Sequence, residues 1–165
     1  MDRDNRRQTS HVPPMISFVA PSGTGKTTLV EQVIASLDRR GLRVAGIKHD
    51  AHRIELDTEG KDSWRMRKAG ADTLLIGENQ LAWMSDSTEA PPLAALVELF
   101  FSAADLVIVE GYRSAGLPTI LVERPEVTDP TWERPASKIL ATVHPSDLPG
   151  ALAAIDRHIA TLTAP

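Results

Sequence analysis

The chain contains no cysteine, and aromatic residues make up only 4% of its 165 residues. The absence of cysteine excludes disulfide bonds, thiolate metal sites and cysteine nucleophiles, and it favours a reducing compartment. Cations are not in excess either: 18 Lys and Arg stand against 22 Asp and Glu, which argues against a nucleic-acid binder. No apolar run reaches the ~18 residues of a membrane span, and residues 1–14 lack the apolar core of a signal peptide. We therefore expect a cytoplasmic protein with no membrane partner.

The composition that is present is that of a globular protein. Hydrophobic residues account for 42% of the chain and charged residues for 24%, which permits a buried core. Residues 1–14 carry five charges and end in two prolines, so they are predicted to form a disordered arm. The length of the remainder predicts a single domain over 15–165.

Strand and helix patterns alternate along this domain. An apolar run at 15–20, a Gly/Ser-rich turn, a helical pattern ending at Gly41 and a second strand at 42–48 form a βαβ unit. This order predicts a three-layer α/β fold with a mostly parallel central sheet. The other expected elements are helices at 61–69, 93–101 and 152–162, strands at 105–109, 119–123 and 138–143, an exposed proline-rich loop at 124–136, and a strand pair at 72–77 and 80–85 that would form a β-hairpin insertion.

The strongest functional motif is APSGTGKTT at 20–28, between the first strand and the first helix. This is the context of a Walker A phosphate loop, although Ala20 stands where the strict motif has Gly. Glycines let the backbone N–H groups point inward and form a nest for phosphate oxygens. Lys26 would then contact the β- and γ-phosphates, and Thr27 would offer its hydroxyl to Mg²⁺. The predicted nucleotide-binding residues are Ser22, Gly23, Thr24, Gly25, Lys26, Thr27 and Thr28; the alternative is a turn that merely caps a helix.

Further candidate residues follow the other strands. Glu110 ends the apolar strand at 105–109 and could complete the Mg²⁺ shell, orient a water molecule or be a surface charge. Lys48, His49 and Asp50 follow the second strand, at the edge of the sheet where α/β folds bind ligands. Asp50 is a second candidate metal ligand and catalytic group. His52 could join His49 and Asp50 in a metal site, but further ligands are not evident, and a polar loop without a role is the alternative.

Two more candidates lie farther along the chain. Asp147 follows the last strand and could accept the N1–H and N2–H₂ of guanine, or it could cap the final helix. In the helix from 61, one face carries Lys61, Trp64, Arg65 and Lys68. Such a face suits a phosphorylated flat heterocycle such as a pterin, but a solvated basic face is the alternative. Ser63 and Arg67 have no role that the pattern explains.

Together these motifs resemble one family of P-loop GTPases, the molybdopterin-guanine dinucleotide biosynthesis protein B family. The resemblance rests on SGTGKTTL at 22–29, GIKHDAH at 46–52, GKDSWRMRKAGA at 60–71 and VEGYR at 109–113. It implies a homodimer that binds GTP with Mg²⁺, hydrolyses it weakly and assists a molybdenum cofactor guanylyltransferase in attaching GMP to molybdopterin or its molybdenum form. The competing interpretation is a P-loop small-molecule kinase or ATPase with Asp50 or Glu110 as base. Such kinases carry an arginine-rich lid, but the candidate lid loops at 53–60 and 124–136 each contain at most two arginines.

Overall fold

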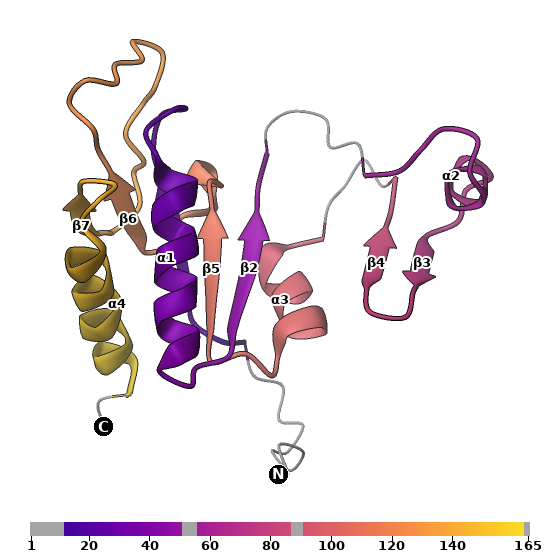
Figure 1. Ribbon diagram of the computed structural model, residues 1–165, viewed down its shortest axis with the longest axis horizontal. Helices are drawn as coiled ribbons and strands as arrows, with labels where there is room; N and C mark the ends of the chain where they lie inside the picture. Colours follow the sequence, from indigo (N-terminus) through magenta and orange to yellow (C-terminus); the bar gives the residue numbers. More distant parts are fainter. Residues whose placement is uncertain (1–11, 51–55, 87–90, 164–165) are drawn as a thin grey trace. The chain divides into compact units, whose positions relative to one another are not determined.

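The computed structural model describes residues 12–50, 56–86 and 91–163, and the contacts within it divide the chain into two compact units (Figure 1). The first unit comprises Met1–Asp50 and Leu93–Pro165, and the second comprises Ala51–Pro92. The second unit is thus inserted into the first along the chain. Within the described ranges, every helix is too short or too polar to cross a lipid bilayer.

A five-stranded parallel sheet forms the centre of the first unit. Its strands lie in the order β2-β5-β1-β6-β7, and every pairing between neighbours is parallel. Because the strands run in the same direction, their carboxyl ends meet at one edge, as Figure 1 shows. The strands are β1 (Met15–Val19), β2 (Val44–Lys48), β5 (Leu106–Glu110), β6 (Thr119–Val122) and β7 (Ile139–Val143).

Helices cover both faces of this sheet. Leu106 and Ile108 of β5 belong to a core cluster with α1 (Lys26–Arg39) and α4 (Leu148–Thr163). The alternate residues Val107 and Val109 belong to a second cluster that includes Val97 of α3 (Leu93–Phe101). Since successive strand residues point to opposite faces, the two clusters are the two sides of one sheet. The predicted three-layer α/β fold is confirmed.

The sequence pattern explains both the buried face of the first helix and the residue at which this helix ends. Leu29, Val33 and Leu37 recur at helical spacing and are fully buried. Gly41 adopts a left-handed φ of 85°, and its N–H donates to the Asp38 carbonyl while the Leu42 N–H donates to the Leu37 carbonyl. These two bonds form a Schellman motif, which ends the helix where the glycine predicts.

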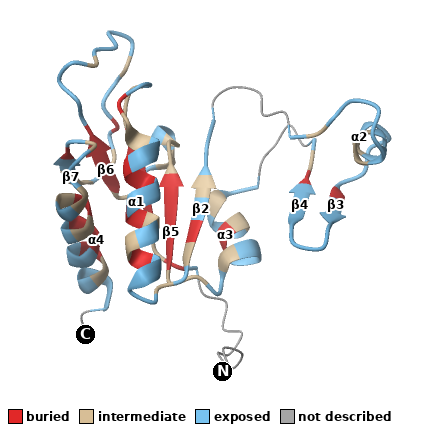
Figure 2. Cartoon of the chain, in the orientation of Figure 1, coloured by how far each residue is buried: buried red, intermediate tan, exposed pale blue. Residues whose placement is uncertain are grey.

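The second unit contains one short helix and one antiparallel hairpin. The helix is α2 (Asp62–Lys68), and β3 (Thr73–Ile76) pairs with β4 (Leu81–Met84), which confirms the predicted insertion. Figure 2 shows that this hairpin is exposed except at one end, where Thr73 faces Met84, whereas β5 is buried along nearly its whole length. The hairpin therefore presents apolar side chains that its own unit does not bury.

The N-terminal segment joins the sheet earlier than the sequence predicts. Pro13 is buried, and the Pro14 carbonyl accepts a hydrogen bond from Val107 at the start of β5. The sequence predicts that both prolines belong to the disordered arm, because polar segments rich in proline rarely pack. A proline carbonyl remains a full acceptor, so Pro14 extends the sheet although it cannot donate. Residues 1–11 of the predicted arm lie outside the described residues.

Candidate functional site

The loop between β1 and α1 has the backbone conformation that its glycines predict. Gly23 and Gly25 adopt left-handed φ angles of 75° and 91°. A side chain at Gly25 would also meet Pro145, because an ideal Cβ there would lie 3.2 Å from the Pro145 Cβ. The buried Thr24 hydroxyl donates to the Pro21 carbonyl at 2.7 Å, so Thr24 braces the loop with its side chain. Ser22, Thr27 and Thr28 are exposed.

Helix α1 begins directly at this loop, and the first N–H groups of a helix have no carbonyl partner within the helix. Gly25 occupies the N-cap position, and among the described residues no side chain caps the helix start. The first turn also lacks an acidic residue, so nothing within it neutralises the positive end of the helix dipole. Free N–H groups at such a terminus bind anions, and phosphate is the usual ligand.

Glu110 at the end of β5 brings the charged groups of the site together. Its Oε1 accepts hydrogen bonds from Lys26 Nζ at 2.7 Å and from Thr27 Oγ1 at 2.8 Å. Burial raises the pKa of Glu110, but the hydrogen bonds from Lys26 and Thr27 and the charges of Lys26 and Lys48 outweigh burial, so the pKa is lowered. The side chains of Lys26 and Glu110 are only 18% and 12% exposed. Glu110 is therefore an ionised carboxylate held against the start of α1.

These residues fit a polyphosphate with a divalent cation. The Thr27 hydroxyl and the Glu110 carboxylate are the hard oxygen donors that Mg²⁺ prefers. Lys26 and the backbone N–H groups of the loop supply the positive groups that a polyphosphate needs. The left-handed Gly23 has no atom within 4 Å of an ideal Cβ, so ligand oxygens can approach the loop there.

The turn after Glu110 is tied to the exit of β2, a contact that sequence reasoning missed. Gly111 adopts a φ of 82°, and a Cβ there would lie 2.8 Å from the His49 carbonyl oxygen. Tyr112 follows with a φ of 57°, and its ring stacks on the His49 ring with centroids 4.1 Å apart. The His49 N–H also donates to the Glu110 carbonyl. The VEGYR motif thus requires a glycine for close approach and uses its tyrosine to hold His49.

The other residues predicted near this edge lie as follows. Lys48 is opposite Glu110 in the register between β2 and β5. Asp50 is exposed at the end of a described range, and His52 lies outside the described residues. Across the described part of the chain, no group of three or more His, Cys, Asp or Glu side chains is arranged to hold a metal ion. Arg113, in the short 3₁₀ turn Arg113–Ala115, donates to the Glu133 carbonyl at 3.0 Å.

Asp147 has the capping geometry that was one of its two predicted roles. Its Oδ1 accepts a hydrogen bond from the Gly150 N–H at 2.9 Å, and its carbonyl accepts from Ala151 at the start of α4. Asp147 is therefore the N-cap of α4. The same turn carries Pro145, which contacts Gly25, so Asp147 lies in a turn that adjoins the phosphate loop. Contact with a guanine base remains a prediction for this residue.

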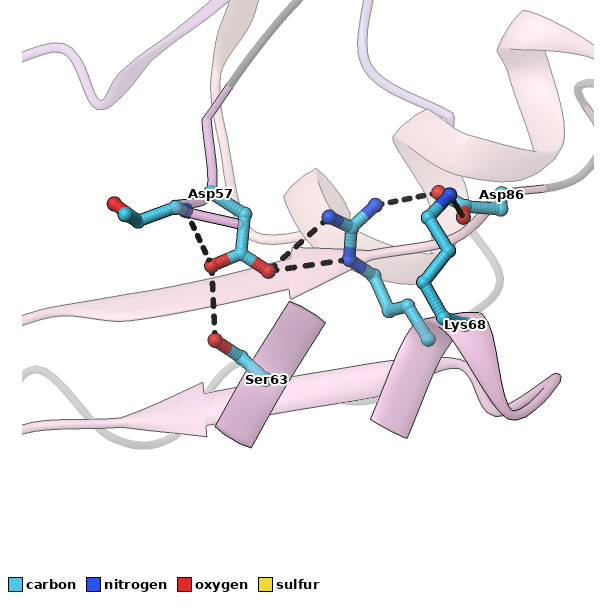
Figure 3. Close-up of polar contacts among 6 residues, drawn as sticks. Asp57, Ser63, Lys68 and Asp86 are labelled. Carbon is cyan, nitrogen blue, oxygen red and sulfur yellow. Dashed lines mark hydrogen bonds and ion pairs between the residues drawn. The ribbon is translucent and has the colours of Figure 1, made fainter. Parts of the chain in front are cut away.

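In the second unit, Arg67 organises the surroundings of α2 through two carboxylates. Figure 3 labels these carboxylates, Asp57 and Asp86, together with Ser63 and Lys68. The Arg67 guanidinium pairs with Asp57 at 3.1 Å and with Asp86, and Asp57 also accepts a hydrogen bond from Ser63. The side chains of Arg67 and Asp57 are only 14% and 8% exposed. These contacts join α2 to segments on both sides of it in sequence. Ser63 and Arg67, which the sequence left without a role, hold this unit together.

The predicted basic face of α2 is less positive than its sequence indicates. Lys68 pairs with Asp86 at 3.1 Å and places its ammonium 5.9 Å from the centroid of the Trp64 ring. Lys61 and Arg65 are exposed, and Trp64 is half-buried. A helical projection of α2 could not predict the pairing of Lys68 with Asp86, because Asp86 lies outside the helix, after β4. A pterin on this face remains a prediction.

A hollow beside the phosphate loop was also missed. It measures about 670 Å³ and is lined by Pro21 of the loop, Glu123 after β6, and residues of the segment 124–132 that include Val127 and Trp132. The sequence predicts an exposed loop over 124–136, but Val127 and Trp132 are half-buried and Pro135 is buried. The only sequence signal was a tryptophan in a proline-rich segment of a chain poor in aromatics.

Comparisons with known proteins agree with this geometry. The family model described as MobB, molybdopterin guanine dinucleotide synthesis protein B, matches residues 15–145. The chain is 37% identical over 147 residues to the molybdopterin-guanine dinucleotide biosynthesis adapter protein of Haemophilus influenzae, a match covering 87% of this chain and 83% of that protein. It is 37% identical over 119 residues to the Escherichia coli protein of the same name, covering 67% of this chain and 66% of that protein.

Solved structures show the same fold. A crystal structure of molybdopterin-guanine biosynthesis protein B aligns with a TM-score of 0.60 at 26% identity, covering 87% of this chain and 97% of that chain. The crystal structure of Bacillus subtilis MobB aligns with a TM-score of 0.59 at 23% identity, covering 86% and 97%. The predicted fold class is confirmed by these likenesses and by the parallel sheet.

Replacing Glu110 with Gln tests the ion pair through the pH dependence of stability. The folded-state pKa of Glu110 lies below its ordinary value of 4.5, so the carboxylate stabilises the fold above that pH. This contribution is lost as the pH falls through the lowered pKa. Urea unfolding should therefore show wild type more stable than Glu110→Gln at neutral pH, with the difference vanishing in acid. Glu31→Gln, an exposed carboxyl on α1, is the control, and an equal difference at every pH would contradict the assignment.

Replacing Arg67 with Ala tests the second unit. The change leaves Asp57 and Asp86 without the guanidinium that both carboxylates contact. We expect faster amide hydrogen exchange in β3 and β4, with β5 unchanged, because Arg67 and β5 belong to different compact units. Arg65→Ala removes an exposed cation from the same helix and should have little effect. Equal exchange in the two variants would show that Arg67 does not organise the unit.

Proposed function

Because this chain belongs to the molybdopterin guanine dinucleotide synthesis protein B family, we propose that it is a GTP-binding adapter in molybdopterin guanine dinucleotide biosynthesis. It binds GTP with Mg²⁺ and assists a molybdenum cofactor guanylyltransferase in attaching GMP to molybdopterin or its molybdenum form. The observation that carries nucleotide binding is the cluster of Lys26, Thr27 and Glu110 at the uncapped start of α1.

Each group in this cluster has a distinct task. The loop N–H groups and Lys26 bind and orient the polyphosphate, while Thr27 and Glu110 hold the Mg²⁺ ion, which would neutralise phosphate charge when bound. Glu110 stays ionised at neutral pH because its pKa is lowered, so it serves as a ligand without first losing a proton. Lys48 is the last residue of β2, and Asp50 follows this strand at the same edge of the sheet.

Hydrolysis of the bound nucleotide is weak in this proposal. An arginine finger accelerates such reactions by roughly 10³ to 10⁵. Arg113 is the arginine that follows the Glu110 turn, and its guanidinium already donates to the Glu133 carbonyl. An adapter that holds GTP without consuming it is consistent with this arrangement.

Guanine is selected by Asp147 in this proposal. The carboxylate caps α4 through Oδ1, and its turn contacts Gly25 through Pro145. A carboxylate beside the phosphate loop can accept the N1–H and N2–H₂ donors of guanine, which adenine does not present. A site that hydrogen-bonds these donors discriminates against a base that lacks them.

The protein is a homodimer in this proposal, joined through the β3–β4 hairpin. Ile76 and Leu81 face each other in the hairpin register and are 75% and 72% exposed. Leu74 and Trp83, which face each other on the same side of the hairpin as Ile76 and Leu81, add to this apolar surface. A two-stranded hairpin is marginal by itself, and exposed apolar patches mark interfaces. A second copy of the chain would bury this apolar surface.

Replacing Lys26 with Ala tests nucleotide binding. Loss of a charge-assisted phosphate contact should weaken GTP binding about ten- to hundredfold, measured by calorimetry with Mg²⁺. The same change should also reduce the extent to which this protein stimulates guanylylation catalysed by the purified transferase. Arg39→Ala removes a cation from the far end of the same helix and is the control. Equal GTP affinity in wild type and Lys26→Ala would remove the claim, and tighter binding of ATP than GTP would favour the kinase or ATPase interpretation.

Replacing Ile76 with Lys tests the dimer. We expect sedimentation equilibrium to show a dimer for wild type and a monomer for the variant, because a charge at an apolar interface must be desolvated. Leu99→Lys places the same charge on α3, at a residue 70% exposed in the first unit. If Leu99→Lys dissociates the dimer while Ile76→Lys does not, the interface lies elsewhere.

A further inference from the structure

The hollow beside Pro21 has walls suited to a flat ring. Pro21, Pro125, Pro130 and Val127 contribute apolar surface, and the half-buried Trp132 contributes an indole. Aromatic and proline faces bind planar heterocycles by stacking, and an indole provides a large, stiff surface for it. The volume of about 670 Å³ is in the range of small-molecule sites.

The polar groups of the hollow are fixed by contacts outside it. Arg134 lies 3.6 Å from the Glu123 carboxylate, and Asp129 accepts hydrogen bonds from the N–H and hydroxyl of Thr131. Two carboxylates are therefore present as acceptors, while Arg124 is the cation among the lining residues. Acceptors of this type match a ring edge that carries an amino group beside a ring N–H.

The position of the hollow separates it from the proposed guanine contact. The Pro21 carbonyl is held by the buried Thr24 hydroxyl, so this wall is part of the phosphate loop itself. The turn that carries Asp147 contacts the loop at Gly25, which is the other end of the loop and the start of α1. A nucleotide whose base reaches the Asp147 turn would leave the hollow at Pro21 for a second molecule.

We propose that this hollow, walled by Pro21 and Trp132, is the site of a second ligand: a flat bicyclic heterocycle with a 2-amino-4-oxopyrimidine ring, stacked on Trp132. Guanine and pterins both carry this ring, and the position at Pro21 assigns the site to a pterin rather than to the nucleotide base. The inference rests on the proposed function, because it places the pterin beside bound GTP. It also moves the pterin from the α2 face to the 124–132 segment.

Fluorescence of Trp132 reports on this site directly. The chain has three tryptophans, so Trp64→Phe with Trp83→Phe leaves Trp132 as the sole indole. We expect neopterin, a soluble pterin, to quench this emission saturably, with and without GTP and Mg²⁺. GTP alone should bind the same protein by calorimetry without comparable quenching. Lumazine, which has an oxo group in place of the 2-amino group, should bind more weakly because it lacks the amino donor.

Calorimetry with Trp132 variants supplies the second measurement. Trp132→Ala should weaken neopterin binding about five- to hundredfold, because stacking is lost, while GTP affinity stays unchanged. Trp132→Phe keeps an aromatic face and should bind nearly as wild type, and thermal melts check that both variants fold. Trp64→Ala tests the α2 face in parallel.

The outcomes separate the two proposals. Quenching by GTP alone would make the hollow the nucleobase site and overturn the second-ligand assignment while leaving GTP binding intact. Loss of neopterin binding in Trp64→Ala but not in Trp132→Ala would return the pterin to α2. Absence of neopterin binding would also overturn the inference, whereas absence of GTP binding with neopterin still bound at Trp132 would defeat only the nucleotide proposal.

Discussion

The contact of Glu110 with Lys26 and Thr27 depends on the register of the central strands more than on any single loop. Glu110 reaches the start of α1 because β5 lies beside β1, with Glu110 opposite Phe18, the residue before the last of β1. The Gly111 N–H donates to the Phe18 carbonyl, and the buried Ser17 hydroxyl donates to the Gly111 carbonyl, which holds the two strand ends together. Without the carboxylate, the largely buried Lys26 ammonium would lose its counter-charge, and uncompensated buried charge is costly.

The features that sequence predicted well are those set by local pattern. The phosphate loop, the end of α1 at Gly41 and the buried strand before Glu110 follow from glycine positions and apolar spacing, and the structure shows all three. The features that sequence missed depend on residues brought together by the fold. Tyr112 stacks on His49 from another strand, and Trp132 joins Pro21 across more than a hundred residues. Such pairings leave no periodic trace in the chain.

The second unit shows how charge counting on a helix can mislead. A helical projection of α2 groups Lys68 with Lys61 and Arg65. In the structure Asp86 pairs with Lys68 and Arg67 and neutralises part of this positive charge. Burial of the Asp57 carboxyl raises its pKa, but hydrogen bonds from Ser63 and Arg67 outweigh burial and lower it. Asp57 therefore remains an ionised partner at neutral pH. Arg67 contributes more to the structure of this unit than the cations of the predicted basic face. Its planar guanidinium pairs with two carboxylates at once.

The chain enters the inserted unit directly after the strand end that neighbours the candidate phosphate site. The chain leaves the first unit after β2, where the His49 N–H donates to the Glu110 carbonyl and the His49 ring stacks on Tyr112. The segment that leads into the second unit is thus fastened to the strand end that carries the Glu110 carboxylate. A ligand that displaces Lys26 or Thr27 from Glu110 acts on this same strand end. The contacts among Glu110, Gly111 and His49 therefore connect the candidate phosphate site to the end of β2, after which the insertion begins.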